Sequence, residues 1–211
     1  MHQAAHSALD PHQLAKAVEL AGKLHAQQKR KLTGAPYLGH LLRVAGLVLE
    51  YGGGQEEVVA ALLHDAVEDQ GGIETYLRIS EQFGPAVAQL VLELSDATES
   101  PKPPWEERKK RFLDRLPTAS LAVHRIVISD KIDNLGQLLA AYERWGDTIW
   151  QKFRGGKEGT LWYHREILKV LGDSPSRPAL EPALAEYRKL VERLELLASP
   201  GTDSSDRSWE I

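Results

Sequence analysis

Several titratable side chains follow one another at the end of an apolar stretch, residues 60–69, with the sequence AALLHDAVED. Burying such groups costs free energy unless they are paired or bind a metal ion. On a continuous helix His64 and Glu68 share a face, as do Asp65 and Asp69. Imidazole beside carboxylate suits a divalent ion such as Mn²⁺, Fe²⁺ or Zn²⁺. The alternative, a solvated acidic helix end, stays open, although carboxylates there oppose the helix dipole.

A second group of polar residues interrupts a strongly apolar helix at residues 130–134, DKIDN. Asp130 and Asn134 share one face there, because they are four positions apart. His40 stands just inside the start of a further helix. Since the chain has no Cys, only His and carboxylate side chains are left to bind such a metal. The inward-facing candidates, on three separate helices, are His40, His64 with Asp65, and Asp130.

The segments that must position these side chains carry helical patterns. Asp10 is typical of an N-cap, with Pro11 in the first turn and Gln13 placed to close a capping box. The β-branched residues 126–128 could form a strand, but we favour a helix there. We expect helices over residues 11–24, 41–49, 55–70, 75–83, 86–97, 105–116, 124–142 and 182–197. Because strand signals are few, the predicted fold is all-α.

We expect a single compact helical bundle over residues 10–197. Its motif-bearing part is residues 10–142, and extra C-terminal helices form an extension over residues 143–197. The polar tail, residues 198–211, is expected to be disordered. The Pro-rich segment 100–104 is predicted to be a long loop, because the segments on either side do not complete separate cores.

Composition narrows the class of protein further. The 211 residues include 30 Asp and Glu against 26 Lys and Arg, a net charge of −4. This balance argues against a general nucleic-acid coat, which needs a basic face to displace counterions. No apolar run reaches the ~18 residues of a membrane span, and the first residues lack the basic and apolar parts of a secretory signal. We therefore expect a cytoplasmic protein without a nucleic-acid or membrane partner, and its oligomeric state stays open.

Three sequence blocks together resemble a known family. They are HAQQKRK with GAPYLGH at residues 25–40, LLHDAVED at 62–69 and SDKIDNL at 129–135. The last two are similar to the motifs "LLHD-x-VED" and "ADK-x-x-NL" of the HD-type alarmone hydrolases. That family includes the hydrolase domain of RelA/SpoT enzymes and the stand-alone small alarmone hydrolases. Order and spacing fit over residues 10–140, so the resemblance implies an HD-domain helical bundle.

The resemblance also implies roles for individual residues. The four metal-ligand positions, usually for Mn²⁺ although another divalent metal is possible, are His40, His64, Asp65 and Asp130. Glu68 and Asp69 fall on the pair that activates and orients the attacking water. Arg30 and Lys31 match the basic pair beside the base and phosphates, and Asn134 matches a substrate contact. The implied substrate is a small nucleotide, ppGpp, pppGpp or ppApp, an alarmone of the stringent response. The implied reaction removes its 3′-pyrophosphate.

The same residues suit that chemistry on physical grounds. A carboxylate within hydrogen-bond reach can orient a water molecule or take its proton, and Glu68 is the first candidate and Asp69 the second. The cluster Lys29-Arg30-Lys31 supplies a local anion site, and a guanidinium can stack on a purine. The basic run at residues 108–111 is either a solvated helix face or a contact to phosphates.

Some positions depart from the family pattern. Leu41 stands where Pro is usual, Gln70 where Thr is common, and Gln137 where a small hydroxyl residue is often found. These changes leave the metal chemistry intact but the base and phosphate specificity open. Only about seventy residues follow the matched region, so a hydrolase without a synthetase domain is expected. Two alternatives remain: an HD-fold nucleotidase or phosphomonoesterase that releases phosphate, and a non-catalytic nucleotide sensor.

Overall fold

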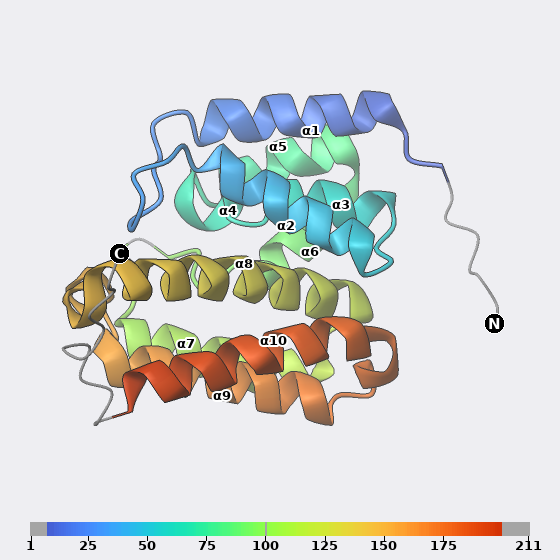
Figure 1. Cartoon of the computed structure of the whole chain (residues 1–211). Coiled ribbons are helices and arrows are strands. Elements are labelled where there is room, and N and C mark those ends of the chain that lie inside the picture. The colour runs from blue at the N-terminus through green and yellow to red at the C-terminus, as the bar shows by residue number, and fades with distance from the viewer. Residues whose placement is uncertain (1–7, 100, 200–211) are drawn as a thin grey trace, which may run out of the picture.

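The computed structural model describes residues 8–99 and 101–199, and these stretches contain helices but no β-strand (Figure 1). The predicted all-α fold is confirmed. One isolated β-bridge pairs Lys29 with Pro36 in the loop that carries the basic cluster. Most of the tail expected to be disordered, residues 200–211, lies outside the described residues. Within the described part of the chain, no helix is both long and apolar enough to cross a membrane.

The helices follow one another as separate segments. In chain order they are α1 (Pro11–Leu24), α2 (Leu38–Glu50), α3 (Gln55–Leu62), α4 (Ala66–Asp69), α5 (Ile73–Phe83), α6 (Pro85–Leu94), α7 (Trp105–Arg115), the 3₁₀ turn η1 (Leu116–Thr118), α8 (Leu121–Trp145), the 3₁₀ segment η2 (Gly146–Lys152), α9 (Gly156–Asp173) and α10 (Arg177–Ala198). The last helix therefore begins five residues before the expected start, and Pro182 lies inside it.

Helix α8 lies between two layers of helices, with α1 to α6 on one side and α7, α9 and α10 on the other (Figure 1). Each layer has its own cluster of buried apolar side chains, and α8 contributes to both. Ile126 packs in the α1–α6 cluster, whereas Val127 and Ile128 pack in the other. These β-branched residues are therefore helical, and all three are buried because α8 is covered on both sides.

The expected helix over residues 55–70 is wrong in one respect, because it breaks at Leu63. There α3 ends, and α4 begins only at Ala66. His64 stabilises the break, since its Nδ1 lies 2.8 Å from the carbonyl oxygen of Ala61. On an unbroken helix His64 and Asp65 would point about 100° apart. The break lets both side chains face the same point, and it removes the predicted common face of His64 and Glu68.

The start of α1 confirms the predicted N-cap but not the capping box. The Asp10 side chain accepts a hydrogen bond of 2.8 Å from the His12 N–H. The backbone N–H of Asp10 donates to Gln55 Oε1 at 2.8 Å, instead of to Gln13. This bond joins the start of α1 to the start of α3, so the capping interaction is tertiary.

The ring of Trp105, the first residue of α7, packs against glycines at the start of α9. A Cβ on Gly155, the N-cap of α9, would lie 2.6 Å from the Trp105 ring, whereas one on Gly172, inside α9, would meet nothing within 4 Å. Because overpacking costs about 1–3 kcal/mol, Gly155→Ala should lower the free energy of unfolding by that amount. Gly172→Ala should raise it by about 0.5–1 kcal/mol. Urea titrations of both variants measure these values, and equal stabilities would contradict the packing role.

Candidate active site

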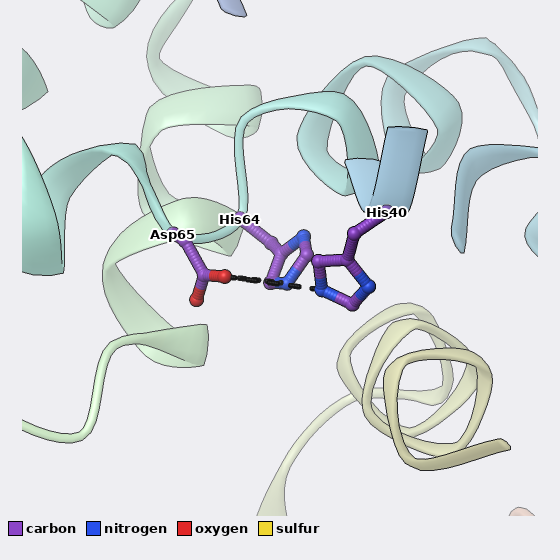
Figure 2. A group of neighbouring side chains, drawn as sticks. All are labelled: His40, His64 and Asp65. Atoms are coloured by element: carbon purple, nitrogen blue, oxygen red, sulfur yellow. Dashed lines mark ion pairs between the residues drawn. The ribbon is translucent and has the colours of Figure 1, made fainter. Parts of the chain in front are cut away.

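Three separate segments bring four potential metal ligands to one point. His40 lies in the first turn of α2, His64 and Asp65 in the break before α4, and Asp130 in the middle of α8. Figure 2 shows His40, His64 and Asp65 facing one another. His40 Nε2 lies 3.2 Å from Asp130 Oδ1 and 4.0 Å from Asp65 Oδ2. His64 Nε2 lies 3.1 Å from Asp65 Oδ2 and 3.7 Å from Asp130 Oδ1.

The donor atoms of this cluster fit a divalent cation. The Nε2 atoms of His40 and His64 are buried and have no hydrogen-bond partner. Their Nδ1 atoms are engaged elsewhere, with Asp133 Oδ2 at 2.6 Å and the Ala61 carbonyl at 2.8 Å. Since each Nδ1–H donates to an oxygen, each Nε2 lone pair faces the two carboxylates, which is the tautomer that binds metals.

The electrostatics of the cluster favour a positive charge. Burial alone lowers the pKa of His64, but the Asp65 and Asp130 carboxylates outweigh it and raise that pKa to about 9. Burial raises the pKa of Asp130, but the Lys131 ammonium and the two imidazoles hold it well below its usual range. A proton and a metal ion compete for such a site, so the same charges that retain the proton attract the cation.

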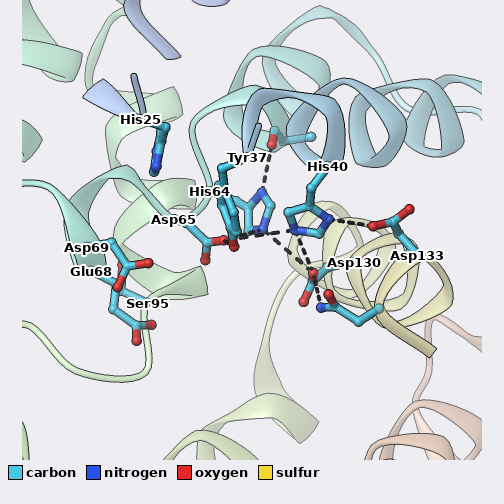
Figure 3. A network of polar contacts seen from close by, with 12 residues as sticks. His25, Tyr37, His40, His64, Asp65, Glu68, Asp69, Ser95, Asp130 and Asp133 are labelled. Carbon is cyan, nitrogen blue, oxygen red and sulfur yellow. Dashed lines mark hydrogen bonds and ion pairs between the residues drawn. The ribbon is translucent and has the colours of Figure 1, made fainter. Parts of the chain in front are cut away.

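Neighbouring side chains hold the two carboxylates in place (Figure 3). The Tyr37 hydroxyl donates a hydrogen bond to Asp65 Oδ2. Asn134 Nδ2 donates to Asp130 Oδ1 at 2.6 Å, and Lys131 Nζ donates to Asp130 Oδ2 at 2.7 Å. Asn134, expected at a substrate-contacting position, therefore also contacts Asp130.

The acidic pair Glu68 and Asp69 lies on the other side of Asp65 from the imidazoles (Figure 3). Lys102 Nζ bridges the pair, at 3.1 Å from Glu68 Oε1 and 2.9 Å from Asp69 Oδ1. The Asp96 backbone N–H donates to Glu68 Oε2 at 3.1 Å, and Gln28 Nε2 donates to Asp69 Oδ2 at 2.9 Å. Burial, with the charges of Asp96 and Asp65, raises the pKa of Glu68. This raised pKa favours the acceptance of a proton from water by Glu68.

A cavity of about 560 Å³ opens in front of the cluster and the acidic pair, and a second one of about 310 Å³ adjoins it. Arg30 lines the second cavity, where its guanidinium donates to Gln137 Oε1 at 2.8 Å and to Asn134 Oδ1 at 2.9 Å. Three lysines and four aromatic residues line both cavities: Lys31, Lys109, Lys131, Tyr37, Trp105, Phe153 and Tyr163. This mixture suits an anionic ligand with a planar ring.

The basic run at residues 108–111 divides between the two predicted roles. Arg108 is buried and pairs with Asp96 and with Glu68, while Lys109 Nζ lies 2.5 Å from Asp96 Oδ2. Both side chains line the larger cavity. Lys110 and Arg111 are exposed and pair with acidic residues of the same helix. Only half of the run therefore forms a solvated face.

Sequence reasoning assigned no role to several residues that complete this site. They are Tyr37, Asp96, Lys102 and Asp133. A sequence signal exists for Asp96, because this acidic residue stands two positions after the apolar helix α6 and before the basic helix α7. Asp133 lies in the apolar helix α8 at a position that the motif leaves open. Lys102 stands in a loop whose sequence indicates only irregular structure.

His164 lines the second cavity, and its lowered pKa should make the free energy of unfolding depend on pH. Burial, with the Lys131 and Lys109 charges outweighing that of Asp130, lowers its pKa to about 3, and its Nδ1 lies 2.6 Å from the Tyr187 hydroxyl. Below about pH 6.5 the unfolded chain gains a proton on this residue that the folded chain does not. Lowering the pH from about 7.5 to about 5.5 should therefore cost about 1 kcal/mol more in the wild type than in His164→Gln. Urea titrations at both pH values measure this difference. An equal loss of unfolding free energy in the wild type and in His164→Gln would contradict it.

The chain is similar in sequence to known proteins. Residues 17–161 match the model of the HD domain family. The chain is 35% identical over 174 residues to the mouse guanosine-3′,5′-bis(diphosphate) 3′-pyrophosphohydrolase MESH1, covering 75% of this chain and 92% of that protein. It is 36% identical over 129 residues to the enzyme of the same description from Aquifex aeolicus, covering 60% of this chain but only 18% of that longer protein.

Two solved structures have a similar fold. A metazoan ortholog of SpoT that hydrolyses ppGpp superposes with a TM-score of 0.70 at 24% identity, covering 87% of this chain and 97% of that one. The protein lmo0812 from Listeria monocytogenes superposes with a TM-score of 0.63 at 34% identity, covering 72% of this chain and 96% of that one. The overall arrangement of the helices therefore recurs in other proteins.

Proposed function

We propose that this chain, which belongs to the HD domain family, is a metal-dependent hydrolase that removes the 3′-pyrophosphate of an alarmone such as ppGpp. The observation that carries this proposal is the pair of buried, unpartnered Nε2 atoms of His40 and His64, which face two carboxylates. Relatives that share this region are 3′-pyrophosphohydrolases by description, and the adjoining cavities offer cations for a nucleotide with two diphosphate groups.

The proposed roles follow the geometry. His40, His64, Asp65 and Asp130 would hold a divalent ion, which when bound would lower the pKa of a water molecule and offset the charge of the phosphoryl group. Glu68, whose own pKa is raised, takes the proton of the attacking water. Asp69, next to it, orients that water.

Cationic side chains would hold the substrate around this centre. Lys102 and Arg108, which now pair with Glu68, lie at the wall where the pyrophosphate would bind. Binding of an anion there draws Lys102 away from Glu68 and Asp69, which frees the carboxylates for the water. Arg30 and Lys31 would contact the nucleotide on the side of the second cavity. Charge-assisted contacts of this kind give both affinity and orientation.

Finer points of the proposal rest on the same residues. Mn²⁺ is the proposed metal, since two imidazoles with two carboxylates form the mixed nitrogen and oxygen set that it accepts. Both guanine and adenine alarmones are proposed substrates, because Gln137 in the second cavity can donate to or accept from either base. We treat residues 10–197 as one catalytic unit, because Thr160 and Tyr163 of α9 line both cavities together with Asn134 of α8.

The decisive experiment separates pyrophosphate from phosphate as the product. The purified protein with Mn²⁺ is offered ppGpp, ppApp, NADPH and deoxynucleoside monophosphates, and both products are quantified. We expect one pyrophosphate for each ppGpp or ppApp consumed. Phosphate alone, from the monophosphates, would make the chain a phosphomonoesterase instead. Tight binding of ppGpp without any product would make it a nucleotide sensor.

A further inference from the structure

Asp133 occupies an unusual place beside the cluster. Its side chain is inaccessible to solvent, and its Oδ2 lies 2.6 Å from Nδ1 of His40 (Figure 3). This contact is on the edge of the ring that faces away from the cluster, since Nε2 is the atom that faces Asp65 and Asp130. Asp133 therefore touches a proposed metal ligand without itself reaching the point where the four ligands meet.

A buried carboxylate is stable only when charges and hydrogen bonds compensate it. Arg30 Nη2 lies 3.3 Å and Gln137 Nε2 lies 3.2 Å from Asp133 Oδ2. Arg43 Nε lies 2.6 Å from Oδ1, in an ion pair whose arginine side chain is 63% exposed. Asp133 is thus held from three directions, and its orientation toward His40 does not depend on His40 alone.

The imidazoles of His40 and His64 differ in the group that accepts a hydrogen bond from Nδ1. Nδ1 of His64 lies against a neutral carbonyl, whereas Nδ1 of His40 lies against a carboxylate. An ionised acceptor at Nδ1 fixes the tautomer and raises the basicity of Nε2 more than a carbonyl does. A carboxylate at Nδ1 of His40 therefore favours the binding of a cation at His40 Nε2.

We infer that Asp133 is a positioning residue, which holds the His40 ring with Nε2 toward the metal and strengthens it as a ligand. The inference rests on the proposed metal site. A purely structural role, tying α8 to α2, would predict lower stability without a change in the affinity for metal.

The test measures the affinity of the full chain for Mn²⁺ alone, by calorimetry, beside thermal unfolding without metal. Asp133→Asn keeps an acceptor and removes the charge, and Asp133→Leu removes both. We expect the dissociation constant to rise about 10- to 100-fold, more for Asp133→Leu. Arg43→Gln, which removes an exposed partner of the same carboxylate, should bind Mn²⁺ no more weakly than the wild type.

The outcomes separate this inference from the proposed function. A wild type that binds no Mn²⁺ contradicts the proposed metal site itself. A wild type that binds, with folded Asp133 variants within twofold of it, overturns only the positioning role.

A measurement on the wild type covers the case in which the Asp133 variants do not fold. With diamagnetic Zn²⁺ as the probe, long-range ¹H–¹⁵N spectra should show a protonated Nδ1 and a metal-shifted Nε2 for His40. The Nδ1 proton should lie further downfield than that of His64, because its acceptor is a carboxylate. A His40 that is protonated at Nε2, or that keeps its metal-free shifts, would overturn the inference.

Discussion

The Asp65→Ala variant should lose metal-dependent turnover by at least about a thousandfold, because a metal-activated water is the proposed nucleophile. Asp65 Oδ2 lies 3.1 Å from His64 Nε2 and faces the same point as His40. Its loss removes one of only two carboxylates among the four proposed ligands. Initial rates with ppGpp and Mn²⁺, together with Mn²⁺ content after gel filtration, measure the effect.

The fold of this variant should survive. Asp65 lies in the turn before α4, where its side chain accepts a hydrogen bond from Tyr37 and caps no helix. The matched control is Asp114→Ala, since Asp114 is exposed on α7 and lines neither cavity. We expect wild-type rates for the control and similar circular dichroism for both variants. Turnover that persists in a folded, metal-depleted Asp65→Ala protein would contradict the metal assignment.

The second large effect is expected for Glu68→Gln, which should lower kcat about 10²- to 10⁴-fold, the usual contribution of a general base. The substitution keeps the shape of the side chain and its hydrogen bond from the Asp96 N–H, but it removes the proton acceptor. In contrast to Asp65→Ala, it should leave Mn²⁺ binding nearly unchanged, because Glu68 lies apart from the four ligands (Figure 3). Single-turnover rates and Mn²⁺ titration separate the two effects.

Glu81→Gln, at an exposed position of α5, is the control for this substitution. The variant Asp69→Asn shows which member of the acidic pair contributes more to kcat. We expect a smaller fall in kcat than for Glu68→Gln, because only the orientation of the water is lost. If Asp69→Asn proves the more damaging of the two, the roles of the pair are reversed. A Glu68→Gln enzyme with wild-type kcat would exclude Glu68 as the base.

Most helices were predictable because their apolar spacing and caps are local signals. The break between α3 and α4 was not, because residues 55–70 continue the helical pattern without a Gly or Pro. At the end of α3 the side chain of His64, which follows the helix, donates a hydrogen bond to the carbonyl oxygen of Ala61 in its last turn. The capping partner of Asp10 was missed for a related reason, since Gln55 is far away in the sequence.

In the candidate site, too, the residues within local motifs were predictable and those that act through distant contacts were not. The sequence motifs located the His64-Asp65 step, the acidic pair and Asp130, because each motif is short and lies in one segment. Tyr37 and Asp133 act through contacts that join distant segments, to Asp65 and to His40. The packing of α2 against α3 sets the first contact, and the packing of α2 against α8 sets the second. No local pattern contains that information.

The position of α8 between two layers has an evolutionary consequence. One face of this helix packs Ile126 with α1–α6 and the other packs Leu138 with the C-terminal helices, while Asp130 faces the two histidines. A volume change in the layer of α9 and α10 shifts α8, and a shift of α8 moves Asp130. The two layers are therefore constrained to diverge together, and compensating substitutions among homologues should link α10 to the surroundings of His40.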